Sequence, residues 1–151
     1  MSKPYLVRKE KAMGDTAVDG LIAGLVAGTV MMLVLTIGGI PGQTPPLQIV
    51  GYFDPAQGGS WLTGLLAHLA VSAIYGVVFA LLLEGAARIR PVFRQRGWAW
   101  GAGYGLVLYA LARGVLLTAV DFPLVQIATW NLILDHIVYG LVLGVQLRSH
   151  S

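Results

Sequence analysis

The chain has 151 residues, of which 56% are hydrophobic and only 11% are charged, and its mean hydropathy is +0.74. One water-soluble core cannot hide so much apolar surface, so lipid must cover a large part of it. The absence of cysteine excludes disulfides, thiolate metal sites, iron–sulfur clusters and covalently attached c-type haem. The net charge of +3 comes from clustered basic residues, which indicate membrane topology and do not imply nucleic-acid binding.

Four apolar stretches reach the roughly 20 residues that a membrane-spanning helix needs. They cover residues 18–39, 61–84, 98–120 and 127–147. The connections between them are too short to hold a second domain. The sequence therefore predicts an all-α integral membrane protein in which residues 1–151 form a single domain, built as a four-transmembrane-helix bundle.

Basic residues outside the predicted spans occur only at the two termini and in the connection between spans two and three. The other two connections contain no lysine or arginine. By the positive-inside rule, both termini and the arginine-rich connection face the cytoplasm, where phospholipid headgroups would contact the arginines. The residues concerned are Lys3, Arg8, Lys9, Lys11, Arg88, Arg90, Arg94, Arg96 and Arg148.

The connection at residues 40–60 is predicted to lie on the outer side. It contains four prolines and four glycines, so no long regular element is expected there. Several of its side chains are nevertheless too apolar for a free loop, and we expect them at the membrane interface or against a neighbouring subunit. These side chains are Leu47, Ile49, Val50, Tyr52 and Phe53.

Two glycine ladders with a spacing of four residues predict close helix packing. Glycines four apart share one helix face and let another backbone approach closely. The spacing leaves three partners open, namely the other ladder, the neighbouring span or another protein. Spans two and four each carry a Tyr-Gly pair, so the chain looks like two repeated helical hairpins. The ladders are Gly20, Gly24 and Gly28 in span one, and Gly97, Gly101 and Gly105 in span three.

Four ionisable side chains lie at a similar predicted depth inside the spans: His68, Arg113, Asp135 and His136. A charge at such depth costs about 2.5–3.5 kcal/mol on insertion scales, so these groups should face the bundle and pair. We expect Arg113 to form a bidentate ion pair with Asp135. The alternative is that Arg113 reaches outward to a headgroup or to Asp121.

The two histidines are expected to face the same space inside the bundle. Three interpretations are open for His68 and His136: neutral imidazoles that satisfy nearby polar groups, axial ligands of a b-type haem, or hydrogen-bond partners of a quinone. The simplest of these needs no cofactor. The sequence contains no recognisable catalytic triad, phosphate-binding loop or metal-binding His-x-x-x-His, so we predict neither enzyme activity nor a metal site.

Three short motifs resemble those of uncharacterised four-span bacterial inner-membrane proteins. They are Gly-Leu-Ile-Ala-Gly-Leu-Val-Ala-Gly at residues 20–28, the stretch from His68 to Tyr75-Gly76, and His136-Ile-Val-Tyr-Gly. The chain is also similar to small accessory subunits of respiratory or photosynthetic complexes of green filamentous bacteria, such as alternative complex III. The resemblance implies the bacterial cytoplasmic membrane and other membrane subunits as partners.

The function expected from the sequence is therefore that of a non-catalytic accessory subunit in an energy-transducing membrane complex. Its glycine-rich helix faces and outer connection would contact the neighbouring subunits. The alternative is a small electron-transfer protein that contacts haem or quinone through His68 and His136. A transporter of a small solute is the third expectation.

Overall fold

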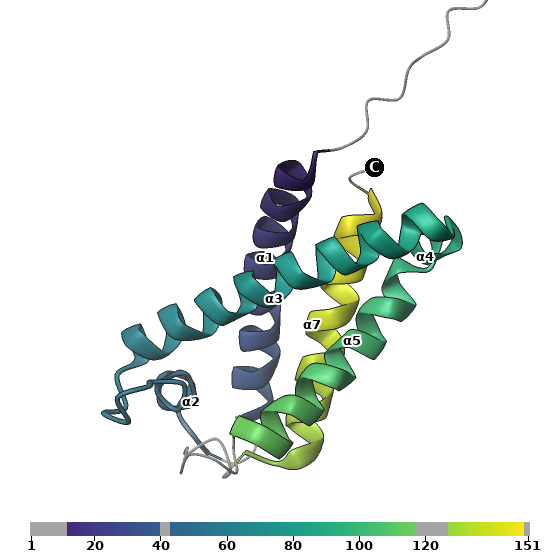
Figure 1. The fold of residues 1–151 in the computed structure, drawn as a ribbon. Helices are drawn as coiled ribbons and strands as arrows, with labels where there is room; N and C mark the ends of the chain where they lie inside the picture. The colour runs from purple at the N-terminus through teal and green to yellow at the C-terminus, as the bar shows by residue number, and fades with distance from the viewer. Residues whose placement is uncertain (1–11, 40–42, 117–126, 150–151) are drawn as a thin grey trace, which may run out of the picture.

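The structure is a computed structural model that describes residues 12–39, 43–116 and 127–149. These residues form helices and connecting turns, with no strand among them. Figure 1 shows the arrangement. The helices are α1 (Met13–Gly39), α2 (Pro46–Gly51), α3 (Trp61–Ile89), α4 (Val92–Gln95), α5 (Gly97–Leu111), the π-helical turn η2 (Ala112–Leu116) and α7 (Thr129–Ser149).

Three of the described helices, α1, α3 and α7, are long and apolar enough to cross a membrane. This confirms the all-α class and the membrane-type helices predicted from the sequence. The stretch predicted as the third span begins as α5, which has 15 residues, and continues directly into the five residues of η2. The rest of that stretch, residues 117–120, lies outside the described residues. The four-span bundle therefore stays a prediction.

The long helices pair as two hairpins. Helix α1 packs along α3, and α5 packs along α7. The hairpins meet chiefly where α1 contacts α7, whereas α3 and α5 make few contacts with each other. In Figure 1, α5 and α7 run side by side, and α3 crosses the other helices obliquely.

The first glycine ladder is buried against α3. A methyl group added at Gly20 would lie 2.7 Å from the Cβ of Ala80 and 2.8 Å from the carbonyl oxygen of Gly76. A methyl group at Gly24 would overlap the carbonyl oxygen of Ser72. Glycine is thus required here because the two backbones approach within a distance that leaves no room for a side chain.

The second ladder makes the same kind of contact with α7. A methyl group at Gly97 would lie 2.8 Å from the carbonyl oxygen of Gly144, and one at Gly101 would overlap the carbonyl of Gly140. Each ladder therefore packs on the following long helix of its own hairpin, which was one of the three partners left open by the sequence. The glycine faces of α1 and α5 are buried in these contacts within the chain, so they do not offer a surface to another subunit.

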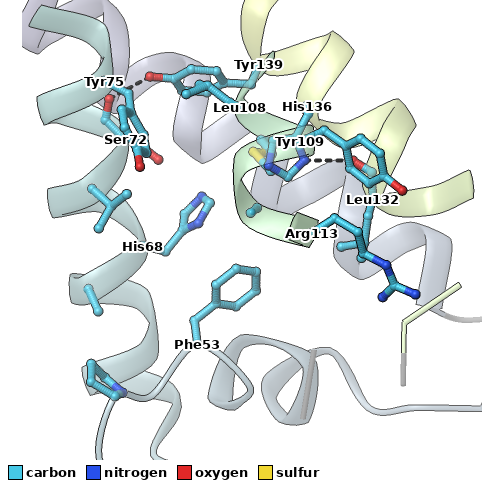
Figure 2. Close-up of a pocket in the computed structure, with 15 residues that line it drawn as sticks. Phe53, His68, Ser72, Tyr75, Leu108, Tyr109, Arg113, Leu132, His136 and Tyr139 are labelled. Atoms are coloured by element: carbon cyan, nitrogen blue, oxygen red, sulfur yellow. Dashed lines mark hydrogen bonds between the residues drawn. The ribbon is translucent and has the colours of Figure 1, made fainter. Parts of the chain in front are cut away.

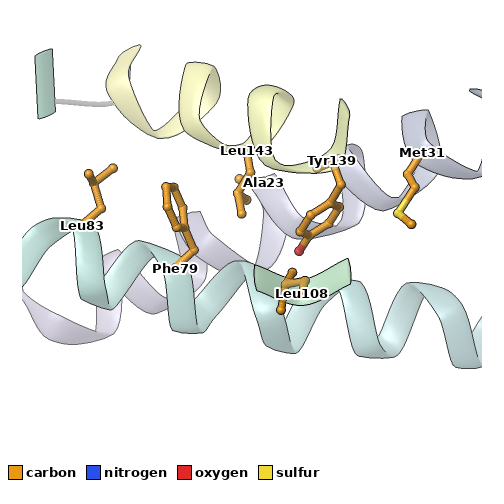
Figure 3. Packing of buried hydrophobic residues seen from close by; sticks show 8 residues of the cluster. Ala23, Met31, Phe79, Leu83, Leu108, Tyr139 and Leu143 are labelled. Carbon is orange, nitrogen blue, oxygen red and sulfur yellow. The ribbon is translucent and has the colours of Figure 1, made fainter. Parts of the chain in front are cut away.

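Hydrogen bonds and an apolar cluster join the two hairpins. The Tyr139 hydroxyl on α7 donates to the carbonyl of Ser72 on α3 at 2.6 Å. The Tyr104 hydroxyl on α5 donates to the carbonyl of Tyr75 on α3 at 2.9 Å. Around these bonds lies a buried core, drawn in Figure 3, whose members are Ala23, Ala27, Met31, Phe79, Leu83, Leu108, Tyr139 and Leu143.

Part of the outer connection folds back onto its own chain. The short helix α2 packs against α1 and α3, and it buries Ile49 and Val50 there. These two side chains were expected at the membrane interface or against a neighbouring subunit, and burial within the chain corrects that expectation. Leu47 remains exposed. The difference arises because six residues of helix suffice to turn one apolar face toward the hairpin.

A buried carboxylate shapes the turn that leads into α3. Asp54 accepts hydrogen bonds from the backbone N–H groups of Ala56 and Ser60, both at 3.1 Å. Burial opposes ionisation of this carboxyl, but the hydrogen bonds from Ser60, Thr63, Ala56 and Gly58 outweigh it and hold the pKa of Asp54 below its ordinary value of 3.8. The ionised carboxylate is therefore the form that fixes this turn.

Some arginines in and next to the arginine-rich connection form ion pairs within the chain. Glu84 forms an ion pair with Arg94, and it also lies 3.5 Å from the guanidinium of Arg88 one helical turn further along α3. Arg90 and Arg96 are exposed. Part of the positive charge in this connection therefore remains at the surface.

Candidate ligand-binding cavity

A cavity of about 320 Å³ lies between α3 on one side and α5, η2 and α7 on the other. It occupies the region where α3 and α5 make few contacts. Its walls are almost entirely apolar, and Figure 2 shows their side chains. The residues that line it are Met31, Phe53, Pro55, Ala67, His68, Val71, Ser72, Tyr75, Leu108, Tyr109, Ala112, Arg113, Leu132, His136 and Tyr139.

Part of the cavity wall lies at the surface of the chain. Pro55, Val71 and Arg113 line the cavity and are exposed. His68, Ser72 and Tyr139, in contrast, are buried. The cavity therefore has an accessible rim and a closed inner end, as a site that admits a small molecule requires.

His68 projects from α3 and is buried, with 8% of its surface exposed. Its Nε2 lies 3.0 Å from the carbonyl oxygen of Gly28 on α1. Since a carbonyl can only accept, Nε2 carries the hydrogen and donates. Phe53 packs edge-on against the imidazole, with ring centroids 5.0 Å apart and an interplanar angle of 67°. This hydrogen bond and the Phe53 ring contact fix the orientation of His68.

His136 projects from α7 and is partly buried. Its Nδ1 lies 2.7 Å from the carbonyl oxygen of Leu132 and donates to it. Tyr109 packs edge-on against this imidazole, with centroids 5.8 Å apart and an interplanar angle of 72°. Each histidine in the cavity therefore has one fixed hydrogen bond to a backbone carbonyl and one aromatic neighbour.

The two imidazoles occupy different positions in the hairpin repeat. Gly76 faces the first ladder and Gly140 faces the second, so these two residues correspond to each other. On this register the counterpart of His136 is Ser72, four residues before Gly76, and the counterpart of His68 is Leu132. The histidines thus stand one helical turn apart in the repeat.

Arg113 differs from its predicted role. It was expected in a buried polar layer as the ion-pair partner of Asp135, but it is exposed and forms no ion pair with that carboxylate. Figure 2 shows its guanidinium directed away from the two imidazoles. The physical reason is its position on η2, where the π-helical turn places the long side chain at the cavity rim. The prediction of an Arg113–Asp135 pair is therefore wrong.

Asp135 is completely buried, yet it does not line the cavity. Both of its carboxylate oxygens lack a hydrogen-bond partner among the described residues. The neighbouring His136 does line the cavity, since consecutive side chains on a helix are about 100° apart. Of the four side chains predicted to form one layer, the cavity brings together His68, His136 and Arg113, and it leaves Asp135 on another face of α7.

Sequence reasoning missed most of the aromatic wall of this cavity. Tyr109 lies four residues before Arg113 and four after Gly105, a spacing that could have placed it on the same face of the third predicted span. Phe53 was noted only as an apolar residue of the outer connection. Its contact with His68 depends on how α2 folds back, which no local pattern indicates.

The chemical capacity of the cavity follows from these contacts. Its walls can enclose a flat, mostly apolar ring, and each of its two imidazoles can form one hydrogen bond with a polar substituent of that ring.

No protein-family model, curated protein or solved structure matches the chain.

Proposed function

We propose that this chain is a non-catalytic integral membrane protein that binds a small, mostly apolar ring compound, of the quinone and hydroquinone class, in the cavity between its two hairpins. One observation supports the proposal: two histidines from different hairpins, His68 and His136, line one largely apolar cavity of about 320 Å³. Ligand sites in proteins typically combine apolar walls with a few polar groups in this way, in volumes of roughly 300–1,000 Å³.

The surroundings of the cavity support a ligand that carries an apolar tail. Val71 and Pro55 expose apolar surface at the rim, and α3, which contributes much of the wall, is of membrane-spanning length. A ring inside the cavity could leave its tail in lipid at this rim.

The charge distribution predicts that both termini and the arginine-rich connection lie on the cytoplasmic side. In that orientation Trp61 and Trp130 mark the outer end of the helices, and Trp98 marks the inner end.

Haem ligation and the accessory-subunit role stay predictions. A haem with two axial histidines would need both imidazoles at one iron, whereas His68 and His136 stand one helical turn apart in the repeat. A partner subunit would have to contact surfaces other than the glycine ladders. The exposed apolar faces of α1 and α3 give no preference between such a partner and lipid.

Filling the cavity should abolish binding. Ala67 lines the cavity, and Ala70, on the same helix, is exposed and does not line it. In lipid nanodiscs, wild-type protein should bind decyl-1,4-benzohydroquinone or its quinone saturably, with one site per chain, by isothermal titration calorimetry. Ala67→Phe should remove this binding because its ring would take up space that the ligand needs, and Ala70→Phe should retain it.

The matched pair separates site binding from partition into the bilayer, because both variants add the same ring to the same helix. Saturable binding that is equal in Ala67→Phe and Ala70→Phe, or no saturable binding in wild-type protein, would overturn the proposed function.

A further inference from the structure

We infer that the cavity selects hydrogen-bond-donating ligands, so that a hydroquinone binds more tightly than the corresponding quinone. This inference rests on the proposed function, because it names the chemical form of the ligand that the same cavity takes. It comes from the hydrogen bonds that already fix the two imidazoles.

Each imidazole has one nitrogen committed as a donor. His68 donates from Nε2 to the carbonyl of Gly28, and His136 donates from Nδ1 to the carbonyl of Leu132. A second proton on either ring would place a positive charge against almost wholly apolar walls, and no carboxylate of the described residues forms an ion pair with either imidazole. The rings are therefore neutral, and each remaining nitrogen, Nδ1 of His68 and Nε2 of His136, can only accept.

Two tyrosine hydroxyls near the inner end are already committed as donors. The Tyr139 hydroxyl donates to the carbonyl of Ser72, and the Tyr104 hydroxyl, outside the cavity lining, donates to the carbonyl of Tyr75. The guanidinium of Arg113 is a strong donor, but it is directed away from the imidazoles (Figure 2). A ligand that reaches the two histidines therefore meets two acceptor nitrogens. The hydroxyls of Ser72, Tyr75 and Tyr109, which also line the cavity, can donate or accept and so favour neither form.

A quinone and a hydroquinone differ in what they can offer to such acceptors. The quinone carbonyls only accept, so each would face an imidazole lone pair without a shared hydrogen. The hydroquinone hydroxyls donate, and they can satisfy the free nitrogen of His68 or of His136. A net hydrogen bond of about 1 kcal/mol corresponds to about fivefold in affinity, and a mismatched buried acceptor adds to the difference.

The test uses three probes with the same decyl tail: decyl-1,4-benzohydroquinone, its quinone and its dimethyl ether. Titrations in nanodiscs under argon should give a dissociation constant for the hydroquinone that is at least about fivefold lower than for the other two. In a His68→Phe, His136→Phe double variant, the hydroquinone and the dimethyl ether should bind with equal affinity, because a phenyl ring has no nitrogen that accepts a hydrogen bond.

The outcomes separate this inference from the proposed function. Equal affinities for all three probes in wild-type protein, or tighter binding of the quinone, would overturn the donor preference while leaving the cavity as a ring-binding site. An advantage of the hydroquinone that survives in the double variant would also overturn it. The absence of saturable binding of any probe would instead contradict the proposed function itself.

Discussion

Replacing Gly101 with alanine should destabilise the protein by about 2 kcal/mol, within the 1–3 kcal/mol that overpacking typically costs. The added methyl group would overlap the carbonyl of Gly140 on α7, which is backbone and cannot rotate away. The helices α5 and α7 must therefore move apart, and close contacts along their whole interface weaken. The measurement is the free energy of unfolding in mixed micelles titrated with dodecyl sulfate.

Gly103 provides the matched control on the same helix. A methyl group at this position would meet nothing within 4 Å, and the residue is exposed. Gly103→Ala should leave stability unchanged or raise it by up to about 1 kcal/mol, because alanine is the better helix former. Equal effects of the two substitutions would show that the second ladder does not pack on α7.

Replacing Asp135 with valine should stabilise the protein by about 1–3 kcal/mol, which is the cost of a buried polar group without a partner. The carboxylate is fully buried, and neither of its oxygens has a hydrogen-bond partner among the described residues. Valine removes this cost at a similar side-chain volume. The same micelle titration measures the change.

The Arg113→Ala variant tests the ion pair that the sequence suggested. Because Arg113 is exposed and does not pair with Asp135, its removal should change stability by no more than about 0.5 kcal/mol. In the double variant with Asp135→Val, the two effects should add. A loss of stability in Asp135→Val, together with a coupling energy above about 1 kcal/mol, would restore the predicted ion pair.

The features that could be predicted from the sequence are those that repeat along the chain. Apolar stretches of spanning length predicted the helices, and the all-α class is confirmed. The boundaries differ modestly, since α1 begins at Met13 and α3 continues to Ile89. Hydropathy locates where the apolar run ends, whereas the backbone hydrogen bonds of a helix continue beyond it into polar residues.

The features that could not be predicted depend on rotation of the helices about their axes. The spacing of the ladders showed that Gly24 and Gly101 needed a close neighbour, but spacing carries no information about which helix supplies it. The depth of Arg113 and Asp135 in the spans made them look paired, yet depth does not specify the direction in which a side chain points. The π-helical turn η2 changes the direction in which the side chain of Arg113 points, and no local sequence pattern indicates such a turn.

The cavity was anticipated only in part. The sequence suggested that His68 and His136 face one space, and both side chains do line one cavity. Its aromatic walls depend on contacts between residues far apart in the chain, and so does the 3.0 Å hydrogen bond from His68 to Gly28 that sets the tautomer of that imidazole. These contacts form when the helices within each hairpin pack on each other, and neither hydropathy nor residue spacing specifies how they do so.

The most direct test of the cavity between the hairpins is cross-linking of paired cysteines, for which a chain without native cysteine is well suited. Ala67 on α3 and Ala112 in η2 both line the cavity, whereas Ala70 does not. A short bifunctional thiol reagent should link Ala67→Cys to Ala112→Cys within one chain in membranes, and it should link Ala70→Cys to Ala112→Cys far less. Equal linking of both pairs, or linking of neither, would contradict a cavity enclosed by the two hairpins.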